Sequence, residues 1–178
     1  MIDLGRRDGR MLRVGHRGAA ALAAENTITS LALAVELGCD LVEAVRNGGL
    51  VERTVVSSFR PATLRALHAL EPGLRLGLTY PEDRYSLGQR RLFAPLMGTT
   101  LAGLRAALPR RIGRMVRGAK ASAAMLHWQV VSKPVVERCH SVGAPVLAWT
   151  LTSRDQVQAL EELGVDGVIA DDPRIFAG

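Results

Sequence analysis

The sequence has few cysteines, few aromatic residues and no long apolar run, and each shortage excludes a class of protein. Its 178 residues include only Cys39 and Cys139, which lack the spacing of a zinc site or a disulfide scaffold. No apolar run approaches the ~20 residues of a membrane-spanning helix, and residues 1–7 lack the apolar core of a signal peptide. We therefore expect a protein of the reducing cytoplasm.

Aromatic residues make up 4 % of the chain, so aliphatic and alanine side chains must fill its core. Hydrophobic residues reach 48 %, which is typical of a globular protein and excludes a disordered one. The net charge of +6 comes almost wholly from arginine, because lysine occurs only at 120 and 133. We expect a flexible leader at 1–10 and one domain at 11–178.

Short apolar runs alternate with amphipathic segments along the chain. The runs predict seven strands, near residues 12, 41, 55, 76, 126, 147 and 168. The amphipathic segments predict helices at 25–37, 61–70, 134–142 and 154–163, with another that starts at 98. This alternation predicts a parallel sheet with right-handed crossovers. A closed eight-stranded barrel usually takes ~250 residues, so the length alone favours an open sheet.

Candidate catalytic residues follow the first two predicted strands. His16 and Arg17 come directly after the first strand, at the end of a parallel sheet that faces ligands. An imidazole moves protons and a guanidinium binds phosphate oxygens. Glu25 and Asn26 open the next helix, as caps or as part of a site. Glu43 ends the second strand, either as a solvated carboxylate or as an oxygen ligand for a hard divalent metal.

Polar and aromatic side chains also lie on or beside the later strands. Ser57, Ser58 and Trp149 end strands, His127 lies on the strand near residue 126, and Asp166, Asp171 and Asp172 flank the last strand. The two serines either donate to a substrate or satisfy the loop that follows them. If the strand near residue 126 runs to Val131, alternation places His127 and Gln129 on one face and Trp128 on the other.

The order of several motifs resembles the glycerophosphodiester phosphodiesterases. The motifs are His16-Arg17-Gly18, Glu25-Asn26-Thr27, Gly38-Cys39-Asp40-Leu41-Val42-Glu43, Val55-Val56-Ser57-Ser58-Phe59, Ala148-Trp149-Thr150 and Gly164-Val165-Asp166-Gly167-Val168-Ile169-Ala170-Asp171-Asp172-Pro173. The resemblance implies an α/β barrel that hydrolyses glycerophosphodiesters to glycerol 3-phosphate and an alcohol, usually with Ca²⁺ or Mg²⁺.

The same resemblance implies roles for single residues. His16 matches the first catalytic histidine, and Arg17 matches the arginine that contacts the phosphate. Glu43 matches the first metal carboxylate. Glu25 and Asn26 match the family's Glu-Asn pair, and Trp149 matches an aromatic residue that lines the substrate pocket.

The chain departs from the family after Glu43, because the family's second metal carboxylate is replaced by Val45. The motifs that carry the second histidine, the third metal carboxylate and a lysine are absent. We therefore expect an incomplete TIM-like barrel of about seven parallel strands with low stability. We also expect a weakly held metal at most, and reduced or absent hydrolysis. A non-catalytic module that binds a phosphate or a lipid headgroup is the alternative, and a homo-oligomer that covers an exposed sheet edge is a further expectation.

A basic stretch runs from Arg105 to Lys120 and contains no acidic residue. It is either a solvated helix face or a surface that binds anionic lipid headgroups. Nucleic acid is disfavoured as a partner, because no recognition motif or stacking aromatic residue accompanies the stretch.

Overall fold

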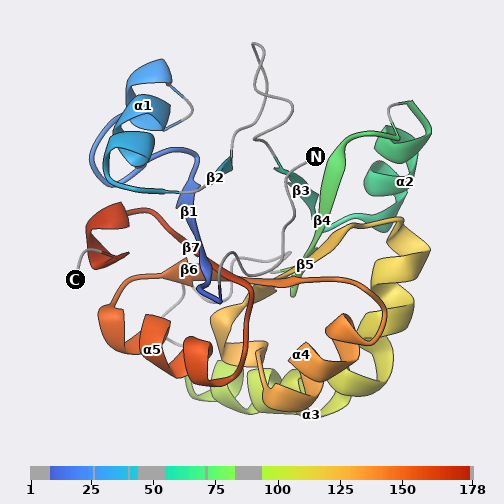
Figure 1. Ribbon diagram of the computed structural model, residues 1–178. Coiled ribbons are helices and arrows are strands. Elements are labelled where there is room, and N and C mark those ends of the chain that lie inside the picture. Colours follow the sequence, from blue (N-terminus) through green and yellow to red (C-terminus); the bar gives the residue numbers. More distant parts are fainter. Residues whose placement is uncertain are drawn as a thin grey trace.

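Seven parallel strands form one curled sheet with the helices on its outside (Figure 1). The computed structural model describes residues 9–25, 27–39, 41–43, 55–70, 72–82 and 94–176. The strand order is β2-β1-β7-β6-β5-β4-β3, and every neighbouring pair is parallel. The predicted fold class, an incomplete TIM-like (β/α) barrel of seven parallel strands, is confirmed.

The elements follow the predicted alternation closely. The strands are β1 (Leu12–His16), β2 (Leu41–Glu43), β3 (Val55–Ser58), β4 (Arg75–Tyr80), β5 (Ala123–His127), β6 (Val146–Leu151) and β7 (Gly167–Ala170). The α-helices are α1 (Ile28–Glu36), α2 (Pro61–Leu70), α3 (Ala94–Ala119), α4 (Lys133–His140) and α5 (Arg154–Glu162). Two 3₁₀ turns follow strands, η4 (Trp128–Val130) and η5 (Pro173–Phe176).

Aliphatic side chains fill the two faces of the sheet. The inner face holds one buried cluster: Leu12, Val14, Val55, Ala123, Met125, Leu147 and Ile169. The residues between them, such as Ala124, Leu126 and Ala148, point outward and pack under the helices. Burial on both faces explains why the strands are nearly all apolar. This packing agrees with the low aromatic content of the sequence.

The sheet has two ends, β2 and β3, which face each other across an opening (Figure 1). Direct pairing of these two strands would close a seven-stranded barrel, but the strand order of the described residues contains no such ladder. The curl nevertheless brings β2 close to β3. As far as the described residues show, the barrel therefore keeps its curvature and has no hydrogen-bonded closure between these two edges.

Three predicted boundaries are wrong for identifiable reasons. The first helix begins at Ile28 and not at Glu25, because the Thr27 hydroxyl caps it by accepting the Ser30 N–H at 3.1 Å. The helix predicted to start at 98 already begins at Ala94. The strand predicted to run to Val131 ends at His127, where η4 turns the backbone and removes the alternation expected for Trp128 and Gln129.

Glycines with positive φ angles follow the ends of α1, α4 and α5. Gly38, Gly143 and Gly164 follow these helices with φ angles of +84°, +73° and +83°. Two further segments lie outside the described residues: 44–53, where the pattern predicts a weak helix or a loop, and 83–92, where it allows a helix. Residues 1–8 of the predicted leader also lie outside them. None of the helices within the described ranges is long and apolar enough to cross a membrane.

Candidate active site

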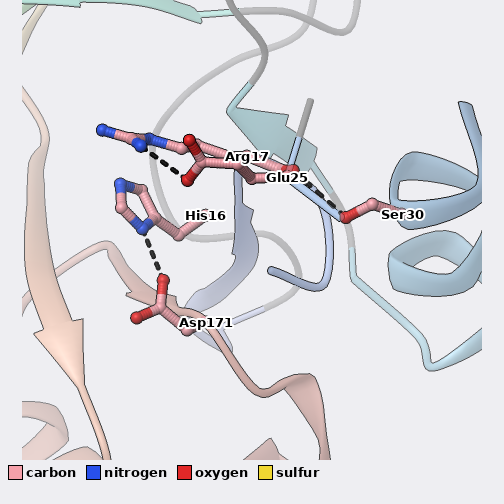
Figure 2. Close-up of polar contacts among 5 residues, drawn as sticks. All are labelled: His16, Arg17, Glu25, Ser30 and Asp171. Carbon is pink, nitrogen blue, oxygen red and sulfur yellow. Dashed lines mark hydrogen bonds and ion pairs between the residues drawn. The ribbon is translucent and has the colours of Figure 1, made fainter. Parts of the chain in front are cut away.

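The loop after β1 is built to place two functional side chains at the mouth of the sheet. Arg17 adopts a positive φ of +51°, and Gly18 follows with a φ of +90°. A Cβ on Gly18 would lie 2.6 Å from the carbonyl carbon of Ser30 and 2.7 Å from its oxygen. The Ser30 hydroxyl donates to the Arg17 carbonyl at 3.2 Å (Figure 2). Gly18 therefore allows α1 to clamp the turn that carries His16 and Arg17.

His16 is held by a carboxylate from the other end of the sequence. Its Nδ1 lies 2.5 Å from Oδ1 of Asp171, which is 155 residues away (Figure 2). The contact exists because β1 pairs with β7, with Gly15 opposite Ala170. A neutral imidazole that donates from Nδ1 keeps its lone pair on Nε2. The pair thus fixes the tautomer that can accept a proton at Nε2.

Arg17 is held by Glu25, whose Oε2 accepts a hydrogen bond from Nη1 at 2.6 Å. Both side chains are exposed, so the pair fixes direction more than it adds stability. Figure 2 shows the guanidinium and the His16 imidazole side by side at the end of β1. Glu25 therefore acts as a support for Arg17. The predicted alternative, a helix cap at Glu25, is replaced by Thr27.

A cavity of about 320 Å³ opens at the C-terminal ends of the strands. His16 and Arg17 line it together with four hydroxyl side chains and an apolar wall. The hydroxyl side chains are Ser57, Ser58, Thr79 and Thr150, and the apolar wall consists of Phe59, Met125, Trp149 and Ile169. The Ser58 hydroxyl also accepts the Arg60 N–H at 3.1 Å, so it serves the loop as well as the cavity.

Thr79 is the polar group of this cavity that the sequence pattern did not single out. It is 9 % exposed, and its Oγ1 has no hydrogen-bond partner among the described residues. A buried hydroxyl without a partner is rare and is usually satisfied by water or a ligand. The alternation of β4, which also turns Gly77 toward the inner-face residue Met125, was the signal that could have found it.

Trp149 forms the aromatic wall of the cavity. Its Nε1–H donates to the Met125 carbonyl at 3.0 Å, which fixes the ring against β5. Phe59 and His127 both contact it edge to face, with ring centroids 5.9 Å and 5.2 Å from that of Trp149. The structure therefore brings Trp149 to the same cavity as His16 and Arg17.

His127 is the second imidazole near this wall. It stands opposite Trp149 in the β5–β6 register, and its Nδ1 accepts the Gln129 N–H at 3.4 Å. Burial opposes the charged form and lowers the pKa of His127 below its usual 6.5. A neutral His127 carries its proton on Nε2.

Among the described residues, the carboxylates near His16 are few, and the side chain of the expected metal ligand Glu43 is not one of them. The backbone of Glu43 stands opposite His16 in the β1–β2 register, but its side chain lies outside the described part, as does all of Asn26. Asp171 and Glu25 are engaged by His16 and Arg17. No group of three His, Cys, Asp or Glu side chains within the described ranges could hold a metal. The described side chains by themselves therefore do not make up the six or more oxygens that Ca²⁺ or Mg²⁺ prefer.

The curled parallel sheet with helices outside defines an incomplete (β/α) barrel. The glycerophosphoryl diester phosphodiesterase family model matches this chain at residues 16–47 and 47–175, so the chain belongs to that family. The match breaks into two pieces at Asn47. That position lies in the stretch where the sequence departs from the family motifs.

Relatives agree with this assignment. A glycerophosphodiester phosphodiesterase from Caldanaerobacter subterraneus subsp. tengcongensis is 25 % identical over 133 residues, which is 75 % of this chain and 44 % of the relative. The chain thus spans less than half the length of that relative.

Solved structures show the same fold. A protein from Silicibacter pomeroyi DSS-3, assigned to the glycerophosphoryl diester phosphodiesterases, superposes with a TM-score of 0.70 at 14 % identity, over 96 % of this chain and 93 % of the other. An Oleispira antarctica phosphodiesterase, solved with the product sn-glycerol-3-phosphate, superposes with a TM-score of 0.65 at 14 % identity, over 93 % and 95 %.

Proposed function

We propose that this chain binds the phosphate of a glycerophosphodiester between Arg17 and the hydroxyl side chains of the cavity, and hydrolyses it slowly. The observation that carries the proposal is the joint placement of His16, Arg17 and Trp149 around one cavity of about 320 Å³. Binding of sn-glycerol-3-phosphate by the Oleispira antarctica phosphodiesterase, which shares the fold, supports this ligand class.

Each part of the cavity suits one part of the ligand. The Arg17 guanidinium retains N–H groups beyond the one given to Glu25, and guanidinium binds phosphate oxygens in a directed way. The hydroxyls of Ser57, Ser58 and Thr150 line the same space and can bond phosphate or glycerol oxygens. The apolar wall of Trp149 and Phe59 suits the carbon backbone of the glycerol unit.

Hydrolysis needs one group to take a proton from water and another to protonate the alcohol that leaves. His16 supplies the first function at Nε2, with Asp171 stabilising the imidazolium that forms. A second positioned acid contributes about 10²–10⁴-fold to such a reaction. The resemblance places that acid in the motif that this sequence lacks, so we propose a turnover reduced by about that factor.

Turnover of glycerophosphocholine tests the proposal directly. Released glycerol 3-phosphate is followed by ³¹P NMR, with added Ca²⁺, with Mg²⁺, and with a chelator. Slow release that disappears in His16→Ala supports hydrolysis at this site. Release that is unchanged in both His16→Ala and Arg17→Ala removes the proposal.

The alternative function is a module that binds a phosphate-containing headgroup without cleaving it. The donor set around the cavity favours it, because hydroxyls and a guanidinium bind phosphate without a metal. Calorimetric titration with glycerol 3-phosphate and with glycerophosphocholine, in the presence of chelator, tests it. Binding that Arg17→Ala abolishes, with no product over long incubation, identifies the module. Equal affinity of Arg17→Ala and the native chain refutes it.

A further inference from the structure

Cations gather on the outer face of α3. Arg110, Arg114 and Arg117 are four and three residues apart, so they lie on one side of the helix, and all three are exposed. The opposite side of the same turns is buried against the sheet: Leu108, Ile112, Val116 and Ala119. The C-terminal half of α3 is therefore amphipathic, with guanidinium groups on its solvent side.

Neighbouring helices extend this basic surface. Arg65 of α2 reaches α3, where its Nη1 donates to the Gly118 carbonyl at 3.2 Å. Arg138 of α4 lies against α3 on the other side, since a Cβ on Gly113 would be 3.1 Å from its Nε. We name the combined surface the α3 ridge, and its members are Arg65, Arg110, Arg111, Arg114, Arg117, Lys120 and Arg138.

The α3 ridge concentrates the charge of the whole chain. Its seven cations exceed the net charge of +6, so the remainder of the chain is close to neutral. The sequence contains no acidic residue between Asp83 and Glu137. Within the described residues, no ridge cation forms an ion pair with a carboxylate. Such a field attracts an extended anionic surface more than a single small anion.

An exposed aliphatic side chain lies at the C-terminal end of α2, next to the α3 ridge. Leu70, the last residue of α2, is 82 % exposed. Among the described residues, two large hydrophobic side chains are exposed, and Leu70 is the more exposed of the two. α2 and α3 lead into β4 and β5, which are parallel neighbours, so both helices end at the same side of the sheet. Figure 1 shows the yellow C-terminal end of α3 beside α2.

We propose that the α3 ridge, with Leu70 as an apolar anchor, binds the surface of an anionic lipid membrane. Cations beside an exposed aliphatic side chain are the combination by which peripheral proteins lie on such surfaces. A nucleic acid would account for the cations of the ridge but not for the exposed Leu70. In addition, α2, α3 and α4 contain no Phe, Tyr or Trp on which a base could stack. The ridge lies on the outer helical layer, so attachment leaves the cavity mouth at the strand ends accessible.

Vesicle sedimentation tests the proposal with matched variants. The native chain is mixed with vesicles of phosphatidylglycerol in phosphatidylcholine, and with vesicles of phosphatidylcholine alone, at low and at high salt. We expect binding to the anionic vesicles and not to phosphatidylcholine alone, strong at low salt and reduced to a small remaining fraction at high salt. Each cation removed weakens that binding about 5-fold, so R114Q/R117Q should weaken it about 25-fold. The control R60Q/R154Q removes two exposed cations elsewhere and should change it less than about 2-fold.

The same series of vesicle experiments tests the role of Leu70 and the competing partner, nucleic acid. L70Q should weaken vesicle binding several-fold and remove the part that persists at high salt, because burial of the leucine is not screened by ions. Circular dichroism confirms that each variant is folded. Absence of binding to anionic vesicles at low salt, or an equal loss in both double variants, overturns the proposal. Tighter binding to duplex DNA than to the vesicles at equal ionic strength overturns it in favour of nucleic acid.

Discussion

Gly18 offers a sharp test of how the turn after β1 is held. Replacing it with alanine combines two penalties: a side chain at a φ of +90°, and a Cβ 2.6–2.7 Å from the backbone of Ser30. The first penalty amounts to ~1 kcal/mol. The second is overpacking against a backbone that cannot yield, since the Ser30 carbonyl accepts the Ala19 N–H at 2.9 Å, and adds ~1–3 kcal/mol.

Gly38 provides the matched control. Its φ of +84° is nearly the same, but a Cβ there would meet no atom within 4 Å. Gly38→Ala therefore carries the backbone penalty alone, ~1 kcal/mol, and the difference between the two variants isolates the contact with Ser30. In a chain of this size ~1 kcal/mol shifts the melting temperature by ~2–4 °C, so Gly18→Ala should melt roughly 4–16 °C below the native chain.

Urea unfolding followed by tryptophan fluorescence gives the two free energies, and titration with glycerol 3-phosphate gives the functional effect. Gly18→Ala should also weaken phosphate binding in the folded protein, because the displaced turn carries Arg17, whereas Gly38→Ala should not. Equal destabilisation by the two substitutions would show that the clamp between Gly18 and Ser30 is absent.

Four further predictions follow from the same structure. Asp171→Asn should abolish any hydrolysis while leaving phosphate binding within about 3-fold, because the carboxylate orients His16 and stabilises its charge without lining the cavity; a matched loss of binding would contradict this. Burial lowers the pKa of His127 in the folded chain, so below about pH 6.5 the unfolded chain binds more protons than the folded chain. The free energy of unfolding should therefore fall as the pH drops below 6.5, and it should fall less steeply in His127→Gln. Burial and the charge of Asp166 raise the pKa of Cys139 to about 12, so this thiol should resist Ellman's reagent until the chain unfolds. Because β2 and β3 share no ladder in the part of the chain that the structure describes, the native chain should melt cooperatively below ~65 °C, and a higher transition would refute the predicted low stability.

The strands could be predicted because each is a buried apolar run bounded by turn residues. The pairing of His16 with Asp171 could not be predicted, because the two residues lie 155 positions apart in the sequence. They meet because β1, the first strand of the chain, pairs with β7, the last. The end of β5 was mispredicted because Val130 and Val131 continue the β-branched pattern, although the backbone has already turned at Trp128. The start of α1 was mispredicted because Glu25 resembles a first-turn acid, whereas its carboxylate is used by Arg17.

The opening between β2 and β3 bears on whether phosphate binding can persist without hydrolysis. The cavity residues His16, Trp149, Met125 and Thr79 stand on β1, β6, β5 and β4, and Asp171, which contacts His16, follows β7. Parallel ladders join these five strands, with one register shift between β6 and β7. The sequence departs from the family motifs between Glu43 and Val55, and these residues belong to β2 and β3, the two outer strands of the sheet. The motifs missing there are those assigned to metal and to the second proton transfer. Phosphate binding should therefore persist when hydrolysis does not, because Arg17 and the hydroxyl groups that we propose bind the phosphate remain around the cavity, whereas the missing motifs are those that the resemblance assigns to cleavage.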